Sequence, residues 1–335
     1  MSNLKKILID KKNCKSLWFM RQAGRYLPEF RKIRADNQDF VQLCLNSQLS
    51  AEITLQPIKR YDIDSAIIFS DILMVPFALG QKVKFIKDQG PVLSNFNLNR
   101  FLDNDKILFS QRLHPIYKAI EITRKRLDQK KSLISFVGAP WTLLIYMLGA
   151  KLNKNKIDFN KIKSKEFEVN VILDKLNEYL CIHIENQINA GADVVQIFDS
   201  WAGLLPINDL PNFCYIPNLK IVEFCKNNKI PVICFPRGIK KNYMDFNKIV
   251  KPNGLNLDYE IDPSWAKKNL TNVILQGGLD PKILFLEDEE IKKNTNKYLN
   301  AFKETPYIFN LGHGLLPETD PIKLGRLIKF YREYK

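Results

Sequence analysis

The chain has 335 residues, of which 45% are hydrophobic, and this length suits one large domain or two of ordinary size. Its formal net charge of +15 raises the possibility of anionic partners. The lysines are nevertheless dispersed, with no long basic run and no aromatic RNA-binding signature, so the charge gives little support to a nucleic-acid-binding protein.

The chain also lacks the common signals for membranes and metals. Its longest weakly polar stretch, 137–150, is too short to span a membrane, and the N-terminus has no long apolar segment with a cleavage site. We therefore expect a cytoplasmic protein without membrane partners. The six cysteines include no Cys-x-x-Cys pair, unlike zinc ribbons, iron–sulfur motifs or disulfide frameworks.

Eight short apolar runs, rich in β-branched residues, recur along the chain. They cover residues 17–20, 66–69, 133–137, 194–198, 232–235, 254–258, 273–276 and 307–311. Continuous apolar runs of this length are typical of strands that are buried on both faces, as in parallel sheets.

Amphipathic segments separate these runs. The clearest is 171–190, where Leu and Ile recur at helical spacing from Leu173 to Ile188 and Gly191 is suited to a left-handed helix end. A second predicted helix covers about 104–128. Eight strands alternating with helices predict an α/β fold, a single (β/α)8 barrel of the TIM type over residues 1–335, with an insertion between strands 2 and 3. The alternative is an open doubly wound sheet, but no Gly-x-Gly-x-x-Gly follows the early strands.

Polar residues and glycines follow most of the predicted strands. They occur at 21–25, 70–71, 138–142, 199–203, 236–238, 277–281 and 312–314. A barrel builds its active site at the carboxyl ends of its strands, so these segments are expected to line one site.

Arginines are concentrated after the first strand. Only 12 of the 51 basic residues are Arg, yet four of them lie within 21–34, namely Arg21, Arg25, Arg31 and Arg34. Guanidinium groups bind carboxylates or phosphates through two parallel hydrogen bonds and stay charged when partly buried. The cluster therefore predicts an anion site at a strand end.

Among the acids, Asp71 is the main candidate because it ends the apolar run at 66–69 and should stand at the barrel mouth. The alternative is that Ser70 and Asp71 only cap the next helix, and Asp199 has the same ambiguity. Tyr146, after Pro140, could line the site or simply pack.

The chain has three histidines. His183 and His114 are expected to be structural, whereas His313 lies between Gly312 and Gly314, which would let the chain turn tightly at a strand end, and is expected to line the site.

No metal or cofactor is expected from these residues. A His-x-Cys zinc pair is absent, because Val232 stands two residues before Cys234, and no phosphate-binding loop or flavin, nicotinamide or thiamine motif is evident. The residues alone predict a barrel that works without a cofactor, with several arginines facing one or two acids.

Five blocks resemble the uroporphyrinogen decarboxylase family. The most specific is Trp-x-Met-Arg-Gln-Ala-Gly-Arg-Tyr-Leu-Pro at 18–28, and the others lie at 66–73, 136–142 with Tyr146, 196–203 and 310–314. The resemblance extends over essentially the whole chain. It implies a (β/α)8 enzyme, usually a homodimer, that removes four acetate carboxyls from uroporphyrinogen without a cofactor to give coproporphyrinogen.

The resemblance also implies roles for single residues. Asp71 would accept hydrogen bonds from the pyrrole N–H groups and stabilise a cationic intermediate, with Tyr146 beside it. Carboxylates would be bound or oriented by Arg21, Arg25 and Arg34, and the polar lining would be completed by Gln22, Ser200 and His313. Arg21 is the family's candidate proton donor, but a water or a substrate carboxyl could serve instead.

Some residues depart from the family pattern. Ser16 stands in place of Pro, Leu148 occupies a position that is often acidic or Ala, and Gly278 replaces Asn, which is expected to loosen a strand-end turn. Two other functions stay open from the sequence. One is a zinc-dependent methyltransferase on the same barrel, and the other is a non-catalytic protein that binds tetrapyrroles or nucleic acid.

Overall fold

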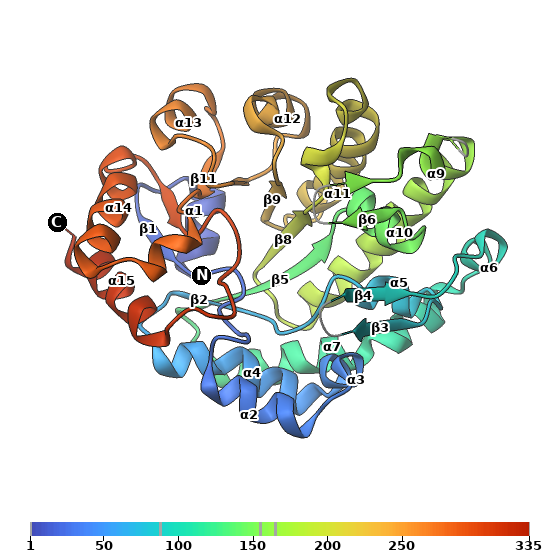
Figure 1. Cartoon of the computed structure of the whole chain (residues 1–335), viewed down its shortest axis with the longest axis horizontal. Coiled ribbons are helices and arrows are strands. Elements are labelled where there is room, and N and C mark those ends of the chain that lie inside the picture. The colour runs from blue at the N-terminus through green and yellow to red at the C-terminus, as the bar shows by residue number, and fades with distance from the viewer. Residues whose placement is uncertain (1, 87–88, 154–155, 164–165, 335) are drawn as a thin grey trace.

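The computed structural model describes residues 2–86, 89–153, 156–163 and 166–334. Eight parallel strands form one sheet in the order β1-β12-β11-β10-β9-β8-β5-β2, which curls into a nearly closed barrel (Figure 1). They are β1 (Lys15–Leu17), β2 (Ser65–Ile67), β5 (Ser132–Gly138), β8 (Val194–Asp199), β9 (Val232–Pro236), β10 (Gly254–Leu257), β11 (Ile274–Gly277) and β12 (Tyr307–Phe309). Each overlaps a predicted apolar run, although β1 shares only Leu17 with the run predicted at 17–20, and the predicted α/β barrel is confirmed.

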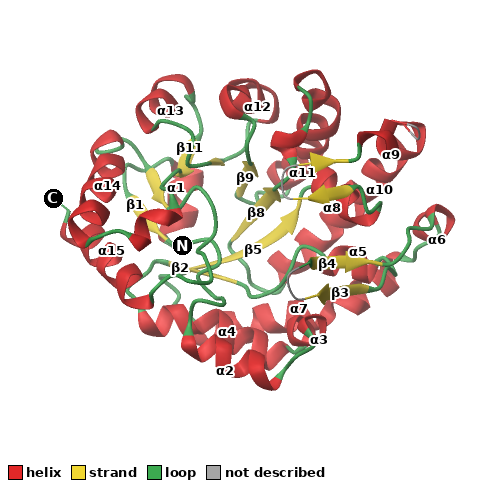
Figure 2. Cartoon of the chain, viewed as in Figure 1, coloured by secondary structure: helices red, strands yellow, loops and turns green. Residues whose placement is uncertain are grey.

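Helices surround the strands (Figure 2). The longer ones are α2 (Pro28–Asp36), α4 (Ser47–Arg60), α7 (Lys106–Arg126), α10 (Glu166–Asn189), α11 (Ile216–Asn227), α12 (Tyr243–Val250), α14 (Asp288–Ala301) and α15 (Pro321–Glu333), with the shorter α3 (Phe40–Leu45), α9 (Phe159–Lys163) and α13 (Pro263–Asn269). The two helices expected at 104–128 and 171–190 are α7 and α10. Gly191 has φ +111° after α10, as predicted for a left-handed helix end.

The predicted insertion separates β2 from β5. Before α7 it contains α5 (Met74–Ala78), the antiparallel pair β3 (Val83–Ile86) and β4 (Gly90–Leu93), and α6 (Leu98–Leu102). In Figure 1 these elements lie at one side of the barrel. A second short pair, β6 (Lys151–Asn153) and β7 (Lys156–Ile157), follows α8 (Pro140–Met147).

The N-terminal helix α1 (Asn3–Asp10) closes one end of the barrel. Its Leu4, Ile7 and Leu8 are fully buried against side chains from the inside of the sheet, including Trp18 and Ile308. The Ser2 and Ser132 hydroxyls lie 2.6 Å apart at the beginning of β5. Helix α1 therefore covers the amino ends of the strands, and the carboxyl ends remain for a site.

The seam between β1 and β2 depends on side chains. The Asp64 N–H donates to Leu17 O at 2.9 Å, and the Leu17 N–H donates to Asp64 Oδ2 at 2.7 Å. The Gln22 amide donates to Ser65 O at 2.9 Å and accepts from the Phe19 N–H, also at 2.9 Å. Gln22 is only 1% exposed, so its amide joins the two ends of the sheet order.

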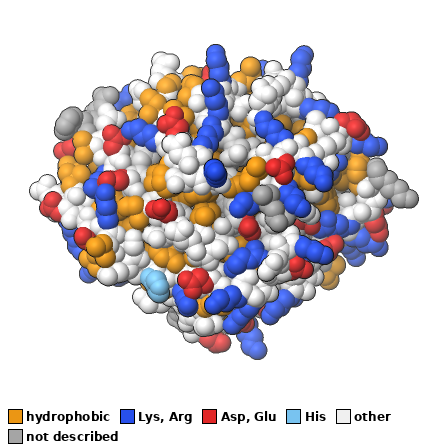
Figure 3. Space-filling model, turned by 180° about the vertical axis from the view of Figure 1, so that it is seen from behind, with side chains coloured by type: hydrophobic (Ala, Val, Ile, Leu, Met, Phe, Trp, Pro, Cys, Tyr) orange, Lys and Arg blue, Asp and Glu red, His pale blue; other side chains and the backbone are white. Residues whose placement is uncertain are grey.

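Surface charge is spread out. Figure 3 shows Lys and Arg scattered among acidic and hydrophobic side chains on one face, without a continuous basic patch on that face. Within the described residues, no helix combines the length and the apolar character needed to cross a bilayer.

Replacing Gln22 by Ala should destabilise the barrel at its seam, because Ser65 O and the Phe19 N–H lose their buried partner. Leaving buried groups unpaired costs about 1–3 kcal/mol. The urea midpoint of Gln22→Ala should fall, whereas Gln129→Ala, at an exposed turn, should match the wild type. Equal midpoints for the two variants would contradict this role of Gln22.

Candidate active site

The candidate site lies at the carboxyl ends of the strands. Arg21 follows β1, Asp71 follows β2, Tyr146 lies on α8 after β5, Arg237 follows β9 and His313 follows β12. Their charges act on one another: Arg25, Asp71, Arg237 and Tyr146 all shift the pKa of Arg21, and Arg237 also shifts that of His313. Residues from five strand ends therefore share one electrostatic environment.

Arg21 is held in a strained turn. The Gln22 N–H donates to Phe19 O at 3.1 Å, which places Arg21 at the third position of the turn with φ +62°. This left-handed conformation favours Gly or Asn and costs about 1–2 kcal/mol for other residues. The turn is fastened to the loop after β12, because Met20 O accepts from the Leu315 N–H at 2.9 Å and the Met20 N–H donates to Asn310 Oδ1 at 3.0 Å.

The Arg21 side chain packs directly against Gly314. A Cβ on Gly314 would lie 2.4 Å from Arg21 Cδ, so any side chain there would have to displace the side chain of Arg21. Arg21 is exposed by surface area, yet burial is the largest cause of its lowered pKa, followed by Arg25. Water therefore reaches the Arg21 guanidinium even though surrounding protein disfavours its charge.

Asp71 has the same combination of access and enclosure. Its side chain is half-buried, and burial raises its pKa to about 6, against the lowering effects of the Leu73 N–H and of Arg21. Oδ1 accepts from the Leu73 N–H at 2.9 Å, so part of the expected local capping role is present. Among the described residues, Oδ2 accepts no hydrogen bond and Arg21 makes no ion-pair contact, so both charges lack a directly bonded partner of opposite charge.

Tyr146 keeps its proton beside this acid. Burial and then Asp71 raise the pKa of Tyr146 to about 12, so its hydroxyl is a donor at neutral pH. Its ring lies 5.9 Å from that of Trp201, and Lys151 Nζ stands 5.8 Å and 5.4 Å from the two ring centroids. Tyr146 therefore packs against Trp201 and also lies close enough to Asp71 for the two groups to interact electrostatically. The two alternatives that the sequence left open, packing and lining the site, are compatible.

His313 is neutral at physiological pH. Burial, Arg21 and Arg237 lower its pKa to about 4, and its Nδ1 lies 3.3 Å from Gly314 O. The flanking glycines serve close approach, because a Cβ on Gly312 would lie 2.3 Å from Tyr259 N and neither glycine has a positive φ. The chain bends at Gly312 and His313, as expected, and glycine at 312 also permits the close approach to Tyr259.

Two of the arginines expected at the site differ in their surroundings. Arg25 is exposed, no described carboxylate pairs with it, and it acts on the pKa of Arg21. Arg34 donates to Asn37 O at the end of its own helix and lies 5.8 Å from the Phe40 ring centroid. The structure brings Arg25 to Arg21 but gives Arg34 local partners.

Other expected residues are also placed. Ser200 is half-buried directly after β8, on the same side as the site, whereas the Gln22 amide is used at the seam. Asp199 is 1% exposed and accepts from the Thr142 hydroxyl at 2.7 Å and the Asn218 amide at 3.1 Å. Asp199 links α8 and α11 to the barrel through hydrogen bonds. Of these two aspartates, only Asp71 has a carboxylate oxygen without a described hydrogen-bond donor.

The remaining histidines are structural or peripheral, as expected. His183 is buried between the Tyr117 hydroxyl and the Gln187 amide, each 3.0 Å away, and His114 is exposed on α7. Among the described residues, no three His, Cys, Asp or Glu side chains gather as a metal site would require.

The turn at Gly278 is firmly held. Gly278 has φ +104°, its carbonyl accepts from the Tyr298 hydroxyl, and a Cβ would lie 2.8 Å from the Tyr298 ring. Glycine fits this position, because the backbone has a left-handed conformation and there is little space for a side chain.

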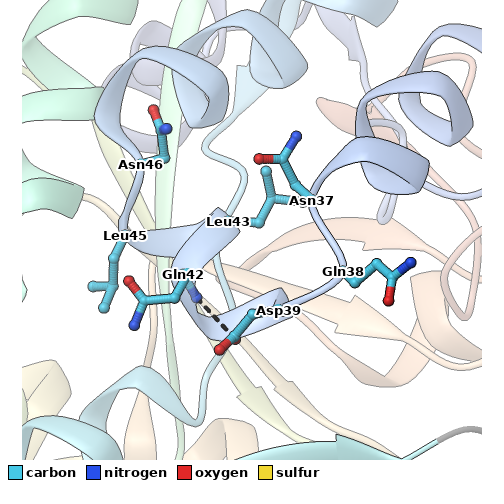
Figure 4. Close-up of a pocket in the computed structure, with 7 residues that line it drawn as sticks. All are labelled: Asn37, Gln38, Asp39, Gln42, Leu43, Leu45 and Asn46. Carbon is cyan, nitrogen blue, oxygen red and sulfur yellow. Dashed lines mark hydrogen bonds between the residues drawn. The ribbon is translucent and has the colours of Figure 1, made fainter.

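A separate surface hollow of about 450 Å³ lies over α3 and the loop before it (Figure 4). Asp39 in its wall accepts from the N–H groups of Val41 and Gln42 as a helix cap. Its lining contains no Lys or Arg and none of the candidate site residues, so it lacks the charge for an anionic ligand.

Comparison with known proteins decides the family. The family model described as uroporphyrinogen decarboxylase (URO-D) matches residues 13–334. The chain belongs to the uroporphyrinogen decarboxylase family. It is 40% identical to a uroporphyrinogen decarboxylase of Orientia tsutsugamushi (strain Ikeda), over 96% of this chain and 95% of that protein. It is 37% identical to that of Cereibacter sphaeroides (strain ATCC 17025 / ATH 2.4.3), over 94% of each.

Solved structures of other proteins share the barrel. A methyltransferase from Methanosarcina mazei gives a TM-score of 0.75 at 17% identity, over 90% of each chain. A B12-independent methionine synthase from Shewanella sp. W3-18-1 gives a TM-score of 0.51 at 12% identity, over 91% of this chain and 88% of that chain. These likenesses are evidence of the fold alone.

Sequence reasoning missed Arg237 as a member of this group. The segment Pro-Arg-Gly at 236–238 was visible as a polar strand end, but a lone arginine far from the cluster at 21–34 carried no further signal. Only the folded barrel brings its charge to Arg21.

Removing the Arg21 charge should raise the pKa of Asp71 above about 6, because Arg21 favours the ionised carboxylate. Carboxyl ¹³C NMR titration of Arg21→Met should show this rise. Arg31→Met, which removes an exposed arginine that donates to Tyr26 O, should leave the Asp71 titration unchanged. A lowered pKa in Arg21→Met would contradict the assigned electrostatics.

Proposed function

We propose that this chain decarboxylates the four acetate side chains of uroporphyrinogen III to methyl groups, giving coproporphyrinogen III in tetrapyrrole biosynthesis. The observation that carries the proposal is the grouping of Asp71 with Arg21 and Arg25 at the carboxyl ends of the strands, where, among the described residues, one oxygen of Asp71 accepts no hydrogen bond and neither guanidinium pairs with a carboxylate. Membership of the family supports the same reaction.

The site complements this substrate at its rim and at its centre. Uroporphyrinogen carries eight carboxylates around a ring of four pyrroles, and guanidiniums are the side chains best suited to bind carboxylates. The pyrrole N–H groups point toward the ring centre and need an acceptor, which the free oxygen of Asp71 supplies. Ser200, Gln22, Arg34 and His313 remain proposed as part of the lining or its support.

The chemistry needs an electron sink, which the pyrrole itself can provide. A proton adds to a pyrrole carbon and makes the ring an iminium-like acceptor. The bond to the carboxylate then breaks, carbon dioxide leaves and the electron pair moves into the ring. A proton next adds to the exocyclic methylene and the ring proton departs, so each acetate consumes one net proton. No cofactor is needed, because the substrate performs the role that cofactors otherwise have.

Asp71 acts on the charge that appears during this sequence. Its carboxylate favours the cationic ring more than the neutral substrate, so it lowers the barrier rather than only tightening binding. Tyr146 remains protonated beside it and can donate a hydrogen bond as the charge changes.

Arg21 is assigned to carboxylate binding. A guanidinium is a very weak acid even when its pKa is lowered, and the neutral His313 carries no excess proton at physiological pH. We therefore assign proton delivery to a water or to a substrate carboxyl.

We further propose a cytoplasmic homodimer of one-domain chains, which the family membership supports. The alternative of a zinc-dependent methyltransferase predicts one tightly bound zinc per chain. Elemental analysis of the purified protein separates the two, and stoichiometric zinc required for activity would overturn the cofactor-free proposal.

The proposed reaction is tested by anaerobic incubation with uroporphyrinogen III, followed by oxidation and chromatography of the porphyrins. The wild type should yield products with seven, six, five and four carboxyls. In Asp71→Asn, kcat should fall by about 100-fold or more with a smaller change in KM, because the lost interaction belongs to the transition state. Full activity of this variant would show that the reaction centre is misassigned.

The pH profile gives a second check on Asp71. The carboxylate is ionised above its pKa, which is about 6, so kcat/KM should decline as pH falls through that value. The decline approaches tenfold per pH unit on the acid side. If the residual kcat/KM of Asp71→Asn declined at low pH in the same way as that of the wild type, the decline would belong to the titration of another group.

Gly314→Ala should lower kcat/KM by about tenfold or more, because the added methyl displaces the Arg21 side chain that lies 2.4 Å from the new Cβ. Gly325→Ala is the matched control, since the nearest heavy atom there, on Tyr61, is 3.8 Å away and the position is helical. Equal activity of the two variants would argue against a fixed position for Arg21.

A further inference from the structure

Arg237 stands on the opposite side of the barrel from the arginine cluster. In the sheet order, β9 is four strands from β1, which is half of an eight-stranded barrel. Arg237 follows β9, whereas Arg21 and Arg25 follow β1. Yet Arg237 lowers the pKa of both Arg21 and His313, so its charge reaches across the mouth.

The backbone of Arg237 is fixed on both sides. Its N–H donates to Asp199 O at 3.1 Å, and its carbonyl accepts from the Gly203 N–H at 2.9 Å. The next residue, Gly238, donates to Asp258 Oδ2 at 2.9 Å. These bonds do not involve the Arg237 side chain, so a substitution can change the guanidinium while the main chain stays in place.

The guanidinium of Arg237 has no hydrogen-bond or ion-pair partner in the part of the chain that the structure describes. Its side chain is half-buried, and no carboxylate among the described residues pairs with it. Four other arginines do form ion pairs with acids: Arg60, Arg124, Arg326 and Arg332. Arg237 therefore differs from these four arginines.

Holding like charges close together is unfavourable. Burial is the largest cause of the lowered pKa of Arg21, and Arg25 and Arg237 add to it. Asp71 is the acid that acts on Arg21, and it cannot neutralise Arg21, Arg25 and Arg237 together. An incoming polyanion would supply the missing negative charge and favour the charged guanidiniums.

We propose that Arg237 binds a carboxylate of the substrate on the side of the mouth opposite Arg21 and Arg25. This rests on the proposed function and specifies how the macrocycle is held: from two sides, with Asp71 beneath its ring. Carboxylates recur at every pyrrole, so two opposed binding points find partners in each of the four orientations that present an acetate for reaction. A one-sided cluster would not fix the tilt of the ring.

The test compares Arg237→Gln, Arg237→Lys and the control Lys241→Gln, an exposed lysine nearby. With uroporphyrinogen III, Arg237→Gln should raise KM about tenfold or more while kcat stays within about threefold, because a uniform binding contact is lost. The KM of Arg237→Lys should lie between those of the wild type and Arg237→Gln, because lysine keeps the charge but cannot form two parallel hydrogen bonds to a carboxylate. Lys241→Gln should match the wild type, and all urea midpoints should agree.

A KM for Arg237→Gln within twofold of the wild type would overturn the proposal, as would a loss confined to kcat. Equilibrium binding of uroporphyrin, the oxidised fluorescent octacarboxylate, provides a readout independent of turnover. Weaker uroporphyrin binding by Arg237→Gln than by Lys241→Gln supports the contact even if the wild type fails to decarboxylate, a result that would overturn only the proposed reaction. Equal binding by the two variants would overturn the role of Arg237.

Discussion

The proposed reaction depends on keeping one carboxylate, that of Asp71, ionised among the positive charges at the carboxyl ends of the strands. Enclosure alone raises the pKa of Asp71, and Arg21 opposes that rise without making an ion pair. If the two groups were in contact, the acid would be neutralised by the protein and would have less to offer a cationic ring. The separation between them is thus as important as their charges, and it is set by the turn at Phe19–Gln22 and the contact with Gly314.

Other contacts in the barrel hold the elements that carry Asp71 and Arg21 in place. Helix α1 covers the amino ends of the strands, while Asp199 and Gln22 bind neighbouring elements and take no part in the proposed chemistry. Arg21 retains a left-handed conformation because hydrogen bonds from the strand-12 loop hold its turn. Strain at a site of this kind persists only where surrounding contacts determine it.

Much of this arrangement was predictable because it is local. Asp71 follows closely after a strand, which places that acid at the carboxyl end of a parallel barrel, and the same holds for Arg21 and His313. Side-chain partners from distant segments were not predictable. Gln22 looks like a site residue in the sequence, but its amide crosses to Ser65 at the seam. Arg237 was missed for the complementary reason, since only closure of the sheet sets it opposite β1.

The guanidiniums of Arg21, Arg25 and Arg237, which pair with no described carboxylate, also affect how the product leaves. Each decarboxylation removes one negative charge from the bound macrocycle, so the attraction between ring and rim weakens with every round. Uroporphyrinogen enters with eight carboxylates and coproporphyrinogen leaves with four, while the cationic rim is unchanged. The reaction thereby loosens its own complex, and departure becomes easiest once the last acetate has gone.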